Sequence, residues 1–209
     1  MTKALSLPMV LDFIFLFEAT VPNPLGSNPI RLRAAPFCDP VRAFDPANFS
    51  NPTQIDNPWF PLVPGSQFIM QGTTSRDEHE IPHRVIFTVT DYTKVINGVR
   101  TIVIYDQDIS EDQLVEAEIA FFAQDNDGNI WNLGEYPEEY ERGIFLGAPD
   151  TWIAGQQQAE AGTLIPGSPQ LRTPLFLQGW SPNIQFLDCG RVSDFAPRIC
   201  IPVGCYETC

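Results

Sequence analysis

VEAEIAFFAQDNDGNIWNLGE, residues 115–135, indicates the fold class more clearly than any other segment of the chain. From Val115 to Ala123 it places apolar residues at every second position, which is typical of a β-strand with one buried face. Asp127-Gly128 favours a type I′ turn, because glycine adopts a positive φ without a steric clash. The second half, Ile130–Leu133, predicts a short return strand that ends at Gly134. We therefore expect a β-hairpin with its tip at Asp127-Gly128.

More strands are predicted around this hairpin. Asn97-Gly98 is a second strong turn signal, and 106–112 is interpreted as an acidic, solvated loop. The additional predicted strands are 66–71, 84–90, 94–96, 99–105 and 198–206. Their succession predicts a mainly β fold, in which an antiparallel meander curls into a barrel or half-barrel.

The first 54 residues are expected to lie outside the β domain. Residues 1–17 form an apolar run, for which three interpretations stay open: an imperfect signal peptide, a retained arm that packs on a partner, or a mis-assigned start. Residues 20–64 contain ten prolines, which predicts an extended arm. The expected organisation is an apolar segment and proline-rich arm at 1–54 and an antiparallel β domain at 55–209. The abrupt end of that domain at Cys209 suggests truncation.

Charge and cysteine content indicate the class of partner and the compartment. The net charge of −14 argues against nucleic acid as a partner, because phosphate binding requires clustered Lys and Arg. The five cysteines have no C-x-x-C pair, which favours disulfides in an oxidising compartment over a zinc site. We expect Cys189–Cys200 or Cys200–Cys205 among them. The predicted location is extracytoplasmic: secreted, periplasmic or membrane-associated.

Three motifs resemble those of a known group of proteins. They are NPWFPLVPG at 57–65, AQDNDGNIW at 123–131 and DTWIAG at 150–155. Together they resemble a group of uncharacterised bacterial secreted proteins and lipoproteins, over about residues 55–205. The resemblance implies an extracytoplasmic β-fold and no catalytic activity.

Aromatic residues are the candidate ligand-binding side chains. The 57–65 motif alternates rigid turns with large apolar side chains, so its aromatics either plug one end of the core or form a platform for a ligand. The candidates are Trp59, Phe60, Phe87, Phe121 and Trp131.

Calcium is the only candidate cofactor. Asp125, Asp127 and Asn129 have the spacing of the first three ligands of a calcium loop, and calcium prefers oxygen ligands. The pattern departs from an EF-hand because Gly128 precedes Asn129 and the twelfth position is Tyr136. A hairpin turn explains these residues as well. A second acidic group, Asp106, Asp108, Glu111 and Asp112, is interpreted as part of the solvated loop.

The expected function is non-enzymatic. The first hypothesis is an extracytoplasmic module that binds a small apolar ligand, or an accessory or structural subunit that docks on a protein partner through its apolar N-terminal segment. The alternative is an acidic, calcium-dependent glycan hydrolase or lyase that uses paired carboxylates. A third interpretation is a truncated paralogue without activity of its own. No G-x-S-x-G, P-loop or dinucleotide-binding motif is present.

Overall fold

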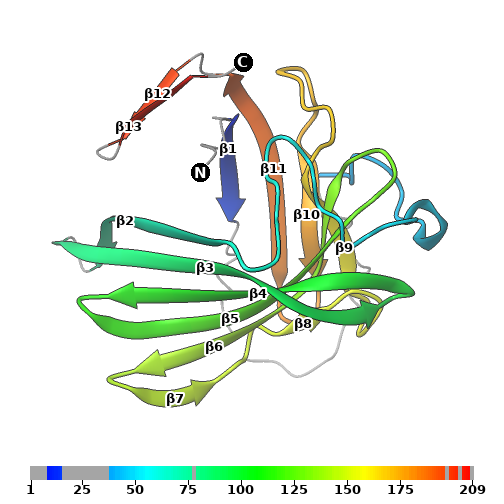
Figure 1. The fold of residues 1–209 in the computed structure, drawn as a ribbon. Helices are drawn as coiled ribbons and strands as arrows, with labels where there is room; N and C mark the ends of the chain where they lie inside the picture. The colour runs from blue at the N-terminus through cyan, green and yellow to red at the C-terminus, as the bar shows by residue number, and fades with distance from the viewer. Residues whose placement is uncertain (1–8, 16–37, 77–78, 196–197, 202–203, 208–209) are drawn as a thin grey trace, which may run out of the picture.

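The computed structural model of the chain describes residues 9–15, 38–76, 79–195, 198–201 and 204–207. The fold is mainly β, and its antiparallel sheet forms an open half-barrel (Figure 1), as the sequence predicts. The strands are β1 (Met9–Phe15), β2 (Gln67–Arg76), β3 (His79–Ile96), β4 (Val99–Ser110), β5 (Gln113–Gln124), β6 (Ile130–Glu141), β7 (Ile144–Gly147), β8 (Trp152–Ile153), β9 (Glu160–Ile165), β10 (Phe176–Ser181), β11 (Phe186–Phe195), β12 (Arg198–Ile201) and β13 (Gly204–Glu207).

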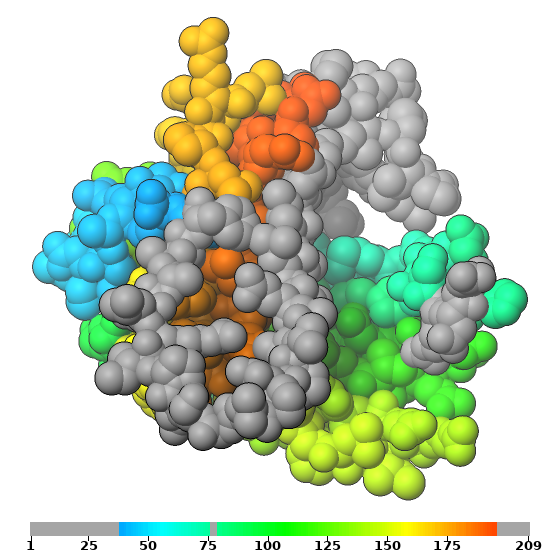
Figure 2. Space-filling view, turned by 180° about the vertical axis from the view of Figure 1, so that it is seen from behind, coloured from blue at the N-terminus to red at the C-terminus, as the bar shows by residue number. Residues whose placement is uncertain are grey.

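One large sheet contains most of these strands, in the order β1-β11-β10-β9-β6-β5-β4-β3-β2, and β7 and β8 pair with β6. In Figure 1, β2–β7 form one layer, and β9, β10, β11 and β1 rise steeply from it. From behind, the same β2–β7 layer projects to one side of β11 (Figure 2). We call the face that looks into this bend the interior face. β1 lies within the predicted N-terminal part, and it pairs with β11 in the same sheet.

The register shows which residues share the interior face. Phe68 pairs with Phe87, Phe87 with Asp106, and Asp106 with Glu118, so one row crosses four strands. Because side chains alternate along a strand, every second residue joins this face. The interior-facing residues of these strands are Phe68 on β2; His83, Val85, Phe87 and Val89 on β3; Ile102, Ile104, Asp106 and Asp108 on β4; and Glu116, Glu118, Ala120 and Phe122 on β5.

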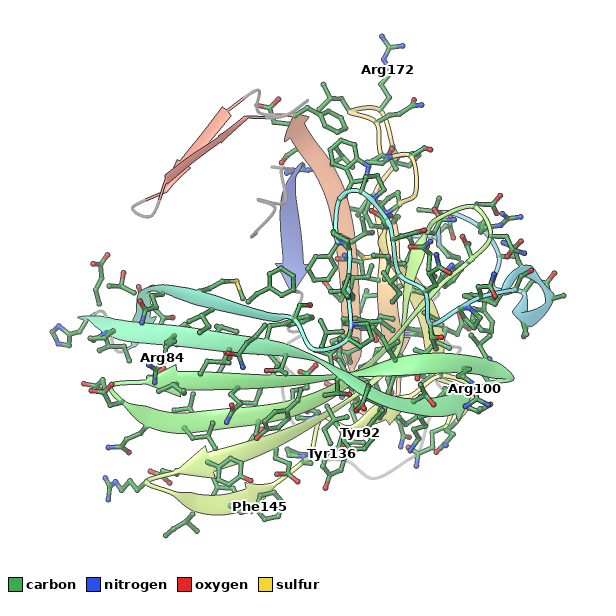
Figure 3. All side chains as sticks on the ribbon, viewed as in Figure 1. Arg84, Tyr92, Arg100, Tyr136, Phe145 and Arg172 are labelled. Atoms are coloured by element: carbon green, nitrogen blue, oxygen red, sulfur yellow. A yellow bond between two sulfur atoms is a disulfide. The ribbon has the colours of Figure 1, made fainter. Side chains whose placement is uncertain are left out.

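Two main apolar clusters stabilise the fold, one on each face. The interior cluster includes Ile104 and Ile130 and is covered by the segment around Leu62. The opposite cluster contains Phe121 and Leu133. Figure 3 shows Tyr136 and Phe145 below the β2–β7 layer, on the side away from β11, which is the outer face.

The predicted acidic loop at 106–112 is wrong. Residues up to Ser110 belong to β4, and the chain turns only at Glu111 and Asp112, whose φ angles are 51° and 60°. Two consecutive positive φ angles are characteristic of a type I′ hairpin turn. Aspartate and glutamate disfavour strands in general, which is why this segment resembled a loop. The predicted strands 84–90 and 94–96 are likewise one continuous strand, β3.

The central hairpin is present, but its tip differs from the prediction. Asn97 and Gly98 have φ angles of 48° and 84°, as a type I′ turn requires, whereas at the central tip only Gly128 is positive, at 83°. There the amide of Gly128 donates to the carbonyl of Asp125 at 3.1 Å, and the loop spans residues 125–129. This is a type I turn followed by a left-handed glycine.

The return strand is longer than predicted. β6 continues beyond Gly134 to Glu141, because a bulge between its pairs with Ala120 and Phe122 absorbs one residue. Gly134 has a φ of 149°, and a Cβ there would lie 2.6 Å from the carbonyl oxygen of Trp152. The predicted strand 198–206 is also corrected, since it is the two-stranded hairpin of β12 and β13.

A disulfide between Cys38 and Cys189 fastens the N-terminal segment to β11. Both residues are buried. The predicted Cys189–Cys200 pair is therefore wrong, because Cys189 is bonded to Cys38. These two residues are 151 positions apart in the chain, and only folding brings them together. Cys200 and Cys205 pair in the register of β12 and β13, but a bond between them lies outside the described side chains. The observed disulfide is compatible with an oxidising compartment.

Within the described ranges, no helix has the length and apolar character needed to cross a membrane.

Candidate functional site

The interior face carries a row of acidic side chains, which we call the carboxylate row. It consists of Asp106 and Asp108 on β4, Glu116 and Glu118 on β5, Glu135 on β6 and Asp188 on β11. Asp106 pairs with Glu118, Asp108 pairs with Glu116, and Glu135 pairs with Ala120, next to Glu118 on the same face. Six carboxylates from four strands thus face the interior of the bend.

Strand alternation explains how acidic residues come to line the interior. On β4 the residues 102, 104, 106 and 108 share a face, and they change from isoleucine to aspartate along the strand. On β5 the same face changes from Phe122 and Ala120 to Glu118 and Glu116. The interior therefore has an apolar end and an acidic end.

Burial and mutual repulsion favour the protonated form of these carboxyl groups. Desolvation raises the pKa of Glu118 to about 9, and repulsion from Glu135 and Glu116 adds to this shift. The pKa of Glu116 is raised to about 7 and that of Asp106 to about 6 by the same causes. Desolvation also raises the pKa of Asp108, against the attraction of nearby His83, whose Nε2 lies 3.8 Å from Oδ1.

Two hydrogen bonds fix the orientation of Glu135. The indole Nε1 of Trp152 donates to Oε2 at 2.9 Å, and Nδ2 of Asn132 donates to Oε1. Burial raises the pKa of Glu135, and both hydrogen bonds oppose that rise. Glu135 is therefore held in place while its charge remains costly.

Asp188 and Gln178 form the polar inner end of the site. Asp188 is 8% exposed and Gln178 is fully buried. Among the described residues, Oδ1 of Asp188 and Oε1 of Gln178 have no hydrogen-bond partner, although Nε2 of Gln178 donates to the carbonyl of Leu164 at 2.8 Å. Desolvation, followed by repulsion from Glu135, raises the pKa of Asp188 to about 6. Unpartnered buried acceptors are costly, so their presence calls for a donor.

Aromatic side chains occupy the apolar end of the interior. The ring centroid of Phe87 lies 5.7 Å from that of Phe60, 6.0 Å from that of Phe68 and 6.5 Å from that of Phe122. The ring centroid of Trp59 lies 5.3 Å from that of Phe195 on β11. Phe60, Phe68 and Phe87 are only partly buried. We call Phe60, Phe68, Phe87 and Phe122 the aromatic cluster.

The structure divides the five predicted ligand-binding residues between two faces. Trp59, Phe60 and Phe87 belong to the interior. Phe121 and Trp131 belong to the cluster on the opposite face, where Phe44 lies 5.3 Å from Trp131. The five residues therefore do not form one surface, because Phe121 points away from its neighbour Phe122 on β5.

The predicted calcium residues hold the tip of the central hairpin together. Oδ1 of Asp125 accepts from the amides of Asp127 and Asn129, and Oδ2 accepts from the side chains of Asn129 and Trp131, all at 2.8–2.9 Å. Asp127 forms an ion pair with Arg42. Across the described part of the chain, no group of three or more His, Cys, Asp or Glu side chains could hold a metal ion. Asp125 is thus engaged in the turn, whereas Oδ2 of Asp127 and Oδ1 of Asn129 accept hydrogen bonds from Asn48 and from the amide of Gly167, outside the turn.

We expect Asp125→Asn to lower the free energy of unfolding by about 2–4 kcal/mol, because the amide would direct its NH₂ at buried donors. Urea denaturation measures this loss, and Asp150→Asn is the matched control because Asp150 is exposed. A calcium-dependent stabilisation of the wild type that Asp125→Asn abolishes would instead favour the metal interpretation.

The sequence contained a signal for the carboxylate row that composition obscures. In TIVIYDQD, residues 101–108, the alternation of Ile102 and Ile104 continues through Asp106 and Asp108 without interruption. Extending the strand by that period, instead of ending it at the first acidic residue, places both aspartates on the apolar face. Asp188 and Gln178 have no comparable local signal.

A comparison with known proteins adds no further constraint. No family model, curated protein or solved structure shows significant similarity to this chain.

Proposed function

We propose that this protein is an extracytoplasmic, non-enzymatic module that binds a small, largely apolar ligand on the interior face of its half-barrel. The observation that carries this proposal is the aromatic cluster, whose rings line the inside of the bend; three of them, Phe60, Phe68 and Phe87, remain partly exposed. Ligand sites are concave and mostly apolar, with a few polar groups that set orientation. The aromatic cluster and the carboxylate row supply these two components side by side.

The disulfide supports the proposed compartment. Cys38 and Cys189 are separated by 151 positions in the chain, and both are buried. Disulfides of this kind persist in oxidising environments, outside the cytosol. The resemblance of the 57–65 and 123–131 motifs to those of secreted proteins points in the same direction.

A glycan hydrolase is the second candidate, because Glu118 and Glu135 lie on adjacent strands of the same face. Such enzymes need one carboxyl group that is protonated and a second that ionises readily. Burial raises the pKa of both Glu118 and Glu135, so neither group suits the second role. The lack of a readily ionised partner for Glu118 favours ligand binding over catalysis.

Binding of the neutral, fluorescent probe N-phenyl-1-naphthylamine tests the proposal. We expect Phe68→Ala to weaken its Kd about tenfold, because burying an aromatic ring contributes about 1.5–3 kcal/mol and 1.4 kcal/mol corresponds to tenfold. The matched control is Ile69→Ala, since Ile69 is 58% exposed and points to the opposite face of β2. Equal binding by both variants would contradict an interior site. Glycan hydrolysis that disappears in Glu118→Gln would contradict a non-enzymatic function.

A further inference from the structure

At the inner end of the half-barrel, two buried acceptor atoms receive no hydrogen bond from the described residues. Asp188 and Gln178 project to the interior from β11 and β10, and the side chain of Gln178 lies against Gly190, two residues from Asp188. The free oxygens Oδ1 and Oε1 are both buried. Glu135 faces Asp188 closely enough for its charge to contribute to the raised pKa of Asp188.

The interior-facing residues of β2–β5 named above offer these acceptors no lysine or arginine partner. The titratable groups that face the inner end are Glu118, Glu135 and Asp188, with Asp106, Asp108, Glu116 and His83 towards the rim. None of the interior-facing residues of β2–β5 named above is Lys or Arg. A ligand that brings both hydrogen-bond donors and positive charge would pair these acceptors and compensate the carboxylates that are ionised.

We propose that the inner end of the half-barrel, at Asp188, Gln178 and Glu135, binds the ammonium group of a primary amine whose apolar body lies along the aromatic cluster. This inference rests on the proposed function and specifies its ligand class. An ammonium group has three N–H donors and no acceptor. Oδ1 of Asp188 and Oε1 of Gln178 would accept two of them, and the carboxylate row would balance the charge. An alcohol would leave the charge uncompensated, and a carboxylate would add to the repulsion.

Matched ten-carbon ligands test this inference on the full chain. In the assay, n-decylamine, n-decanol and n-decanoate are each titrated against bound N-phenyl-1-naphthylamine at pH 8 and in 0.15 M salt. The amine is protonated under these conditions. We expect decylamine to bind at least tenfold more tightly than decanol and decanoate to bind most weakly. The preference for the amine should shrink at pH 5, because the raised pKa values leave the carboxylate row largely protonated there.

Variants separate the inner site from general attraction to an acidic protein. Asp188→Asn should reduce the preference for amine over alcohol at least fivefold while leaving decanol binding in place. Asp150→Asn removes the same charge from an exposed position and should keep the preference. Gln178→Met removes the free acceptor at similar side-chain volume and should also reduce the preference for amine over alcohol. This variant replaces Asp188→Asn as the test if Asp188→Asn does not fold.

Two results would overturn the inference. Equal binding of decylamine and decanol to the wild type would exclude an ammonium site while leaving apolar ligand binding intact. A preference that survives both Asp188→Asn and Gln178→Met would place the attraction elsewhere on the acidic surface. Failure of both the probe and decanol to bind would instead contradict the proposed function itself.

Discussion

Loss of the Cys38–Cys189 disulfide is expected to lower the free energy of unfolding by about 2–5 kcal/mol. The bond links residues 151 positions apart, so its removal releases a long loop in the unfolded chain. In the folded state the adjacent amide of Leu177 donates to the carbonyl of Asp39 at 2.9 Å, so the disulfide and this hydrogen bond together hold that segment on β10 and β11. Urea denaturation of Cys38→Ser, followed by tryptophan fluorescence, measures the loss.

The double variant distinguishes the bond from the packing of two buried thiols. Because either substitution alone breaks the same bond, Cys38→Ser, Cys189→Ser and the double variant should lose similar amounts of stability. Losses that add in the double variant would mean that each side chain contributes separately. Wild-type stability in all three variants would show that the disulfide does not stabilise the fold.

We expect the thermal stability to fall as the pH rises from 5 to 9. In the unfolded chain Asp and Glu release their protons near their ordinary pKa values of about 4, whereas in the folded state Asp106 and Asp188 hold theirs to about 6, Glu116 to about 7 and Glu118 to about 9. Between these limits the folded state binds more protons, so raising the pH favours unfolding. After allowance for the partial exposure of these groups, the free energy of unfolding should fall by about 2–4 kcal/mol between pH 5 and pH 9, or roughly 5–15 °C in Tm.

Glu118→Gln is the variant that isolates this effect. Glutamine keeps the shape of the side chain and removes the buried charge, so we expect this variant to exceed the wild type in Tm at pH 8.5 and to match it near pH 5. Glu141→Gln removes the same charge from an exposed position at the end of β6 and should retain the wild-type pH profile. Identical profiles for Glu118→Gln and the wild type would contradict the burial of this carboxyl group. Calorimetry across the pH range provides the measurement.

Local pattern was sufficient for the mainly β class and for the order of the meander up to β6, but it did not predict β1 or β7–β11. The alternation in residues 115–123 and the Asn97-Gly98 turn act between residues that are close in sequence, so they are readable without the fold. The same reasoning failed where two local signals conflicted. At Asp106 and Asp108 the strand period continued while the acidic composition suggested a loop, and packing against β3 and β5 decided for the strand.

Hydrophobic alternation and turn chemistry are properties of neighbouring residues, so the amino-acid sequence specifies an antiparallel, mainly β fold without reference to distant contacts. Which distant residues meet depends on the folded arrangement of the sheet. The bend in the sheet brings Asp188 of β11 opposite Glu135 of β6, the disulfide selects Cys38 for Cys189, and Phe121 and Phe122 separate onto opposite faces. These choices depend on register, bulges and the closure of long loops, and no local pattern encodes them.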